Sequence, residues 1–461
     1  SGGDNMTITE QAGFTVFINN DEFDDVPVFA VGEDVAFIST SAEFIPFSGV
    51  ENSLADKADF TETAAKLPGD DYNIMAYIDA AELQELNLNV MAMTGQSFPP
   101  AYARMIREGS VSQVWGVTLT DDHTFVMDMA SGAIDSAYYD ELGMEVMIPG
   151  AVDMSFASKI PADAPLVIHG ADFGPLTQNA LDNLRAMGDF LQDNAIFSSL
   201  LGSTMNQTGF PIGDAELALL DSFATPGTFM SVLNVSFSGL TGLSLERDVL
   251  PVLDGDFAMY LRMLPAQDLP DLPAYPDFAL LFQSSDDDGA ATMMDALIEA
   301  SEAYDTDYAV EAYGDNGAAL VFPLVSDLLE FDYNAFDVLV AQDDDVFAIG
   351  SRAAVEAAIS DGDSLSDDAT FQAAGAYLLE GAQQVWYINL DSFGVVLDDI
   401  MTSEADNMRR RDIEDMQVIR YMMSLLEHAT VSMVTSEDGS AIRLTMTLAE
   451  EAVMPTSSED A

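Results

Sequence analysis

Four consecutive residues, Gly362-Asp363-Ser364-Leu365, match the serine motif of an esterase family. In such enzymes the serine is the nucleophile, and a downstream Asp-x-x-His sequence supplies the histidine that activates it. The histidine downstream of Ser364 is His428, and Leu425 stands where that aspartate is required. We therefore interpret Ser364 as part of a loop that leads into a helix.

Residues 284–295 partly match a calcium-binding loop. Such a loop supplies oxygen ligands from fixed positions and turns at a glycine in the sixth position. Here a serine stands first, where aspartate is usual, and an aspartate replaces the usual glutamate at the twelfth position. The candidate ligands at the third, fifth and twelfth positions are Asp286, Asp288 and Asp295. The alternative is a strand-to-helix turn whose acids cap the following helix.

Two further patterns suggest chemistry but have simpler explanations. Asp172-Phe173-Gly174 is like the metal-binding tripeptide of protein kinases, but the other kinase motifs are missing, and Asp391-Ser392-Phe393-Gly394 repeats the pattern later in the chain. Both fit a strand-to-helix junction. The histidines, His123, His169 and His428, are isolated, so a site built from them would need the fold to bring them together. We expect no enzymatic activity.

Surface modification and apolar binding are two other possibilities. Asn5, Asn206 and Asn234 begin glycosylation sequons, which matter only if the source glycosylates exported proteins. The chain has 25 methionines, and the pairs Met293-Met294 and Met422-Met423 stand at helical core spacing. A methionine-rich binding surface is the alternative explanation for this content.

The composition is strongly acidic, with 14 Lys+Arg, 80 Asp+Glu and a net charge of −66. Such a chain repels phosphate backbones and anionic headgroups, which argues against nucleic acids and anionic membranes as partners. The acids are scattered, which is typical of a salt-adapted proteome, and a surface that collects divalent cations is the alternative. There is no cysteine, which excludes disulfides and thiolate sites and favours an exported protein.

An internal repeat organises the sequence. Residues 26–60 align with residues 337–371 without a gap, so that Ser53 falls on Ser364 and Phe60 on Phe371, at an offset of 311. We extend this match to residues 1–60 against 312–371. The later copy is preceded by a predicted strand, helix and strand, so the chain is expected to open inside a structural unit, after removal of a segment that includes an export signal.

A second pattern occurs three times, as a short strand, an acid at a helix N-cap position and a helical stretch. The copies are residues 73–83, 164–176 and 384–397, with Asp79, Asp172 and Asp391 as the expected caps. Strands are predicted after each helical stretch, over residues 114–129, 228–240 and 429–446. This alternation predicts an α+β fold of repeated strand-helix-helix-hairpin units, with mainly antiparallel sheets and a tandem duplication.

The repeat also sets the expected domain boundaries. Residues 1–130 are predicted to be the back half of a first unit, and 131–153 a connector. Residues 154–311 and 312–448 are then the front and back halves of a complete second unit, followed by a polar tail over 449–461.

Four segments carry a family resemblance: residues 160–176, 243–261, 277–300 and 344–371. They resemble a bacterial group of exported or envelope-associated proteins known as domain of unknown function thirty-three fifty-two. The resemblance covers about residues 160–448 as one unit and 1–130 as the back half of another. It implies an exported α+β protein with no assigned activity and no catalytic residues to transfer.

Together these features predict a non-enzymatic, exported structural or cell-surface protein. Because a unit without its front strands exposes sheet edges, we expect self-association through residues 1–60, or pairing with another envelope protein. The alternative function is a soluble extracellular or periplasmic binding protein for a small ligand or a divalent cation, with calcium as the candidate.

Overall fold

The computed structural model describes most of the chain in sixteen stretches. They are residues 6–19, 28–32, 36–39, 45, 54–93, 100–133, 136–193, 234–235, 237–239, 241–265, 274–303, 309–313, 317–322, 337–358, 362–403 and 410–449. The chain divides into two compact units, residues 1–61 and 62–461.

The first unit is a small antiparallel sheet in the order β1-β2-β3-β4. Its strands are β1 (Met6–Gln11), β2 (Phe14–Asn19), β3 (Val28–Val31) and β4 (Ala36–Ser39). Val16, Val28 and Ala30 are buried on one side of it together with Ile45. The 3-10 turn η2 (Leu54–Asp56) follows, and α1 (Ala58–Ala64) leads into the second unit.

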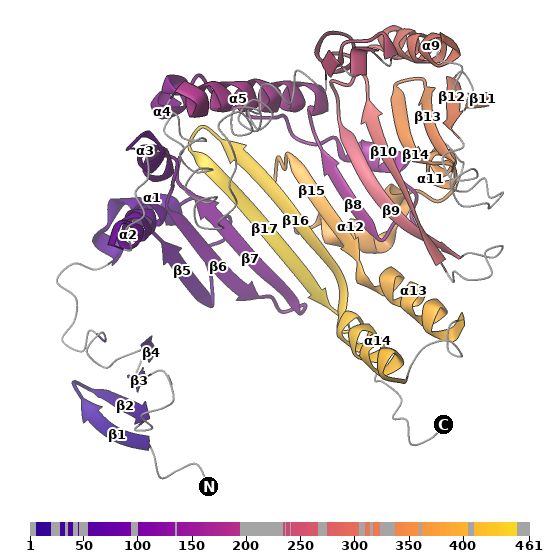
Figure 1. The fold of residues 1–461 in the computed structure, drawn as a ribbon. Helices are drawn as coiled ribbons and strands as arrows, with labels where there is room; N and C mark the ends of the chain where they lie inside the picture. Colours follow the sequence, from indigo (N-terminus) through magenta and orange to yellow (C-terminus); the bar gives the residue numbers. More distant parts are fainter. Residues whose placement is uncertain are drawn as a thin grey trace, which may run out of the picture. The chain divides into compact units, whose positions relative to one another are not determined.

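The second unit is built on one 13-stranded antiparallel sheet, shown in Figure 1. Its order is β11-β12-β13-β14-β10-β9-β8-β15-β16-β17-β7-β6-β5. The strands are β5 (Ile74–Ile78), β6 (Gln113–Leu119), β7 (Thr124–Ser131), β8 (Leu166–Gly170), β9 (Phe257–Pro265), β10 (Ala274–Gln283), β11 (Ala309–Tyr313), β12 (Gly317–Phe322), β13 (Val338–Asp343), β14 (Val346–Ser351), β15 (Gln384–Asn389), β16 (Leu426–Ser436) and β17 (Gly439–Leu448). The predicted mixture of helices with mainly antiparallel sheets is confirmed.

Helices lie at both ends of these strands and on the sheet itself. They are α2 (Ala80–Met93), α3 (Pro100–Glu108), α4 (Ser136–Glu141), α5 (Phe173–Asp193), α9 (Asp287–Ala303), α11 (Arg352–Ala357), α12 (Ala369–Gly375), α13 (Leu390–Ser403) and α14 (Arg410–Met423), with the short turns η3 (Met154–Lys159), η4 (Leu245–Val249) and η6 (Leu365–Asp367). Figure 1 shows α4 and α5 at one end of the strands and α13 and α14 at the other.

One face of the sheet carries the main core. There α11, η6, α12 and η3 pack on the strands, and Phe156, Leu365 and Phe371 meet Tyr260 and Tyr387. On the opposite face, α9 and η4 cover the end of the sheet around β12 and β14, where Met293, Met294 and Val249 are buried with strand residues. The sheet is therefore covered on one side by the main core, from β11 to β15, and on the other side at one end.

The compact units do not follow the predicted boundary at residue 130. Strand β7 pairs with β17 along residues 124–130, so the hairpin that ends the predicted first unit belongs to the large sheet. The division falls instead between Thr61 and Glu62. The predicted connector contains α4, followed by an extended run up to Asp153.

Two parts of the predicted strand-helix pattern are wrong. The strands that follow α5 in the sheet are β9 and β10, and the described residues within 228–240 are helical at 234–235 and 237–239. A short apolar run fits a strand and a buried helical turn equally well. The cap of α13 is Asn389, whose side chain accepts a hydrogen bond from the Ser392 N–H, while Asp391 lies inside the helix.

The 311-residue offset of the predicted repeat places β3 on β13, η2 on η6 and α1 on α12, and it places β1 on β12. The strand order differs at this point, because β1 is the first strand of its sheet, whereas β12 is the second strand of the large sheet.

Candidate binding site on the large sheet

Some strands bury polar side chains and leave apolar side chains partly exposed. In β7, Thr124, Val126 and Asp128 are buried, while Phe125 and Met127 are partly exposed. An antiparallel sheet covered on one side usually buries its apolar face and exposes its polar face. In β7 the arrangement is the opposite. The apolar side chains on the open face are therefore not explained by formation of a hydrophobic core.

The pairing registers show how far this surface extends, since directly opposed residues lie on the same side of a sheet. We call the following three rows, which run from β5 to β10, the apolar face. They are Ala76, Trp115, Met129, Ile442, Met433, Gln384, Gly170, Phe257 and Phe282; then Ile74, Val117, Met127, Leu444, Val431, Trp386, Ile168, Met259 and Leu280; then Leu119, Phe125, Met446, Ala429, Ile388, Leu166, Leu261 and Phe278. Gln384 is the one polar residue among these positions, and none of them is charged.

Much of the apolar face is accessible to solvent. Trp386, in the middle of the sheet, is 41% exposed, and Phe278 and Leu119 are 46% and 55% exposed. From strand spacing and residue rise, the three rows extend over about 38 Å across the strands and about 14 Å along them. Contiguous exposed apolar patches of more than a few hundred Å² are typical of binding surfaces.

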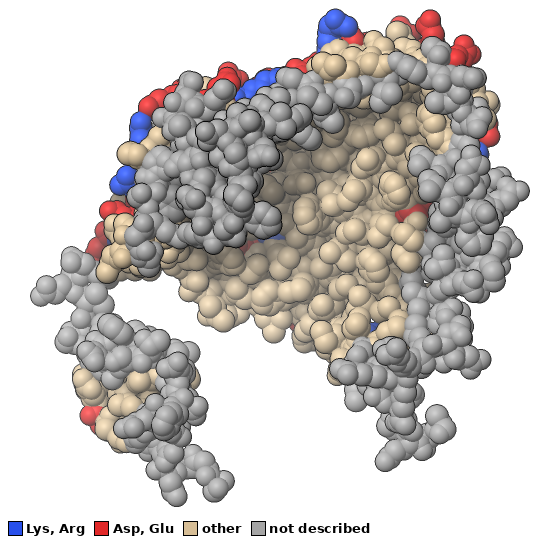
Figure 2. Space-filling model, in the orientation of Figure 1, with Lys and Arg blue, Asp and Glu red and all other residues tan. Residues whose placement is uncertain are grey.

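Figure 2 shows this side of the sheet as a hollow in which uncharged residues predominate, whereas red and blue side chains gather on the outer helices. The helices at the ends of the strands add exposed apolar side chains. They are Leu83, Leu86, Val90, Met91 and Met93 on α2, Leu184 on α5, Val395 on α13, and Val418, Ile419 and Met422 on α14. The exposed apolar surface is therefore not confined to the strands.

Methionines are concentrated on the apolar face. Met127, Met129, Met259, Met433 and Met446 all belong to its rows. An unbranched thioether side chain adapts its shape to different apolar ligands. The pair Met293-Met294 is buried in the core, as its spacing predicted, whereas Met422 is 60% exposed.

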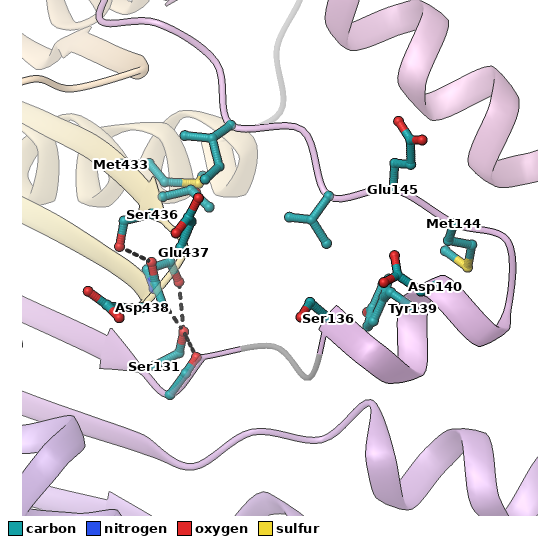
Figure 3. Close-up of a pocket in the computed structure, with 16 residues that line it drawn as sticks. Ser131, Ser136, Tyr139, Asp140, Met144, Glu145, Met433, Ser436, Glu437 and Asp438 are labelled. Carbon is teal, nitrogen blue, oxygen red and sulfur yellow. Dashed lines mark hydrogen bonds between the residues drawn. The ribbon is translucent and has the colours of Figure 1, made fainter.

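A pocket of about 870 Å³ lies at one end of the strands. Its sheet side includes Met433 and three hydroxyl residues next to the apolar face, Ser131, Thr435 and Ser440. Figure 3 shows α4 facing the β16–β17 turn across this pocket. Its remaining residues are Gly132, Ser136, Tyr139, Asp140, Met144, Glu145, Val146, Ile148, Ser436, Glu437, Asp438 and Gly439. The pocket combines an apolar wall with hydroxyl groups and four carboxylates.

On the covered face of the sheet, a buried ion pair joins β7 to β17. Arg443 donates two hydrogen bonds to Asp128, at 2.7 and 2.9 Å, and Asp128 is 1% exposed. The Tyr72 hydroxyl donates a third, at 2.7 Å. Burial and the bond to Asp128 raise the pKa of Tyr72. This cluster is structural, because it binds two strands that are 315 residues apart in sequence.

A second buried carboxylate, Asp277, stabilises the other half of the sheet. It forms an ion pair with Arg262 at 3.0 Å and accepts hydrogen bonds from Ser351 and from the Ala354 N–H. Burial raises the pKa of Asp277 although these partners favour its charged form. Nearby, His169 Nε2 lies 2.8 Å from Asp256, and both side chains are buried.

His428 is expected to make stability depend on pH. Burial lowers the pKa of His428, whose Nε2 lies 3.1 Å from Thr447 Oγ1. As the pH falls, His428 is therefore protonated in the unfolded chain before it is protonated in the folded chain. His428 contributes stability above about pH 6.5, and this stability is lost as the pH falls. In urea titrations between pH 7.5 and 5, the His428→Gln variant should lose less stability on acidification than the unmodified protein. Equal losses in the two proteins would contradict this role.

The predicted calcium ligands do not form a common site. Asp286 accepts a hydrogen bond from the Gly289 N–H at 3.0 Å and caps α9, Asp288 lies in the first turn, and Asp295 lies further along the helix. Among the described residues, no group of three or more His, Asp or Glu side chains is close enough to hold a metal ion. The geometry favours the capping alternative, and the calcium hypothesis stays a prediction.

Substitutions at this helix distinguish the two explanations. Asp286→Ala should lower the free energy of unfolding by about 1 kcal/mol through loss of the cap, with or without added Ca²⁺. Asp295→Ala, on the exposed side of α9, should change it by less than about 0.5 kcal/mol. If Ca²⁺ raises the melting temperature of the unmodified protein and both substitutions abolish that increase, the calcium interpretation is correct.

The other candidate residues have structural partners. Ser364 donates to Asp367 at 2.7 Å and contacts Ser366, whereas His428 contacts Thr447, so these contacts do not pair a nucleophile with a base. Asp172 accepts a hydrogen bond from the Gly150 N–H at the junction between β8 and α5. His123 lies in the β6–β7 turn with φ +65°.

Of the three sequon asparagines, Asn234 lies within the described residues. The Asn234 side chain accepts a hydrogen bond from the Leu245 N–H at 3.1 Å and donates to Glu246 at 3.4 Å. Glycosylation would replace a hydrogen of the Nδ2 group that donates to Glu246, whereas Oδ1 would remain an acceptor. Asn5 and Asn206 lie outside the described residues.

Comparison with family models, curated proteins and solved structures finds no significant match to this chain. The resemblance to the exported bacterial family therefore stays a prediction. Within the described part of the chain, no helix combines the length and apolar character needed to cross a membrane. The case for function accordingly depends on the geometry of the sheet.

Proposed function

We propose that this protein is a non-enzymatic binding protein that holds the acyl chains of a lipid against the apolar face. The observation that carries the proposal is the uncharged apolar surface that continues across nine neighbouring strands and is exposed to solvent at Leu119, Trp386 and Phe278. Its corner at Phe257 and Phe282 is packed against Phe173. It develops the alternative function expected from the sequence, a binding protein for a small ligand.

An acyl chain fits this surface better than a protein partner does. Protein interfaces make roughly one hydrogen bond per 100–200 Å² and have a polar rim, whereas the three rows offer Gln384 as their one polar side chain. An acyl chain needs no hydrogen bonds, and methionine side chains can adapt to chains of different shape.

Charge limits the lipid headgroup. With a net charge of −66 the protein repels anions, and the pocket at the end of the strands contains Asp140, Glu145, Glu437 and Asp438 beside hydroxyl groups. A neutral or zwitterionic headgroup meets this requirement. The pocket is the place in the described structure where an apolar wall and polar groups meet.

The number of buried methylenes sets the expected affinity. Burial of a methylene contributes about 0.8 kcal/mol, so an acyl chain of about 16 carbons offers roughly 13 kcal/mol if it is fully buried. Association costs about 4–15 kcal/mol. A lipid with two chains is therefore expected to bind more tightly than a fatty acid with one.

Transfer of a fluorescent lipid tests the proposal. Vesicles that contain self-quenched pyrene-labelled phosphatidylcholine are mixed with the protein at high salt, and the increase in monomer fluorescence is followed. We expect saturable transfer, with bound lipid detected by native mass spectrometry. If the protein extracts no lipid, the proposal is wrong.

Two broader expectations belong to the same proposal. We infer that the chain contains repeated strand-helix-helix-hairpin units, supported by the common element order in β5-α2-α3-β6-β7 and β15-α13-α14-β16-β17. An extracellular or envelope location is supported by the cysteine-free composition. A structural, self-assembling role is the second candidate, because β5 forms an open edge of the sheet.

A further inference from the structure

Among the described strands, β5 is the last in the large sheet, and it has exposed apolar side chains. Ile74 is 65% exposed, Met75 48% and Ile78 39%, and no residue of the strand is charged. Edge strands of this kind are sites for pairing with another chain, and proteins usually protect them with charges or prolines.

The opposite edge of the sheet is protected in this way. Strand β11 contains Glu311, which forms an ion pair with Arg352 at 2.9 Å. A charged side chain on an edge strand disfavours pairing with another strand. The two edges of the same sheet therefore differ, and β5 is the one suited to a partner.

The interior of the sheet contains a model for such a contact. Strands β8 and β15 pair antiparallel with Ile168 opposite Trp386 at the centre, and each strand is followed by a helix, α5 or α13. The pairs on either side, Val385 with His169 and Tyr387 with Val167, are arranged symmetrically about that centre. The pairing of β8 with β15 therefore has the local symmetry of two identical strands related by a twofold axis.

Strand β5 matches β15 residue by residue. The Asn73 N–H donates to Val117 O, and the Gln383 N–H donates to Met433 O, both at 2.8 Å. The helix that follows each strand has a side-chain cap, from Asp79 in one case and Asn389 in the other, both at 3.0 Å. Ala76 therefore corresponds to Trp386, at the centre of the pairing between β8 and β15.

The backbone of β5 is already oriented for this contact. The Gly132 N–H donates to Ser112 O and the Thr120 N–H to Thr124 O, so the even-numbered residues of β6 bond to β7. Trp115 therefore bonds to Ala76, and the N–H of Met75 points away from β6, toward the edge of the sheet. We propose that two copies of the protein pair antiparallel through β5, with Ala76 opposite Ala76 of the partner subunit.

Pairing would bury side chains that are exposed in the single chain. Met75 is 48% exposed, whereas Val385, at the corresponding place in β15, is 2% exposed. The exposed acids Asp70 and Asp71 lie just before β5, and the net charge of each copy is −66. Because salt screens this repulsion, the dimer is expected to be favoured at high ionic strength.

Sedimentation of matched variants tests the proposal. At high salt the unmodified protein should be a dimer, and Met75→Pro should shift the dissociation constant by at least tenfold, because proline removes an N–H that points outward and leaves the β5–β6 hydrogen bonds intact. Met75→Val retains that N–H and should dimerise normally. A monomer at high salt and high concentration, or a dimer unaffected by Met75→Pro, would overturn the proposal.

The absence of cysteine from the sequence allows a direct test of register. Ala76 and Ala76 of the partner subunit would form a non-hydrogen-bonded antiparallel pair, whose Cα atoms lie about 4.5 Å apart, within the range of a disulfide. The Ala76→Cys variant should form a covalent dimer on mild oxidation, whereas Val310→Cys, on the protected edge, should not. Equal cross-linking by the two variants, or a dimer held by a strand of another protein, would contradict pairing between two copies.

Discussion

Replacing Val431 with glutamate is expected to reduce lipid transfer at least tenfold while leaving the fold intact. Val431 lies in the middle row of the apolar face, opposite Leu444 on β17 and Trp386 on β15. An acyl chain bound there would remove water from the introduced carboxylate, which has no opposite charge within the rows to pair with, and this costs several kcal/mol. The measurement is transfer of pyrene-labelled phosphatidylcholine.

A matched substitution separates the local effect from added charge. Val310 is 50% exposed on β11, at the far edge of the sheet, so Val310→Glu adds the same charge away from the site. This variant should transfer lipid as the unmodified protein does. Val431→Thr, which keeps the side-chain shape, should have an intermediate effect. Normal transfer by a folded Val431→Glu variant would show that lipid does not bind at the centre of this face.

The sequence predicts the elements of the sheet better than it predicts the binding face. The alternation of Phe125, Met127 and Met129 with Thr124, Val126 and Asp128 marks a two-sided strand. Alternation does not say which side is covered, and apolar content would place the methionines inside. Asp128 contacts Tyr72 and is paired with Arg443, which lies 315 residues later in the chain, so burial on the side of Asp128 is a tertiary effect.

Long-range pairing accounts for the other differences. The hairpin β6–β7 is visible in the sequence, but its pairing with β17, which moves the compact boundary to Thr61, depends on residues that are more than 300 positions away. Local signals were more reliable, since the predicted N-cap at Asp79 is confirmed by its hydrogen bond from the Glu82 N–H. The N-cap expected at Asp391 was two residues off, which is the usual precision for helix ends.

The methionine content shows what one sequence leaves open. Both explanations, core packing and a binding surface, fitted the 25 methionines. Met293 and Met294 are in the core, while Met127 and Met433 are on the open face. Helical spacing identified the first pair. The methionines of the apolar face lie on β7, β9, β16 and β17, and only the pairing register brings them together.

Replacing Arg443 with methionine is expected to lower the free energy of unfolding by about 3–5 kcal/mol, because it leaves a buried carboxylate without its partner. Asp128 is 1% exposed and receives two hydrogen bonds from Arg443, while the methionine retains the aliphatic bulk of the side chain. Adding Asp128→Asn should recover much of the loss, since the double variant no longer buries an unpaired charge. The measurement is guanidinium unfolding followed by circular dichroism.

The control is an arginine whose ion pair lies on the surface. Arg247 donates to Asp248 at 2.9 Å, but its side chain is 79% exposed, so Arg247→Met should cost less than about 1 kcal/mol. If both methionine variants cost the same, the Asp128 pair does not hold β7 against β17. If instead Arg443→Met unfolds the sheet from β5 to β7 and also abolishes lipid transfer, the buried polar pair on one face supports the apolar site on the other. We expect this coupling because β7 contributes residues to both faces: Asp128 to the covered face, and Phe125, Met127 and Met129 to the apolar face.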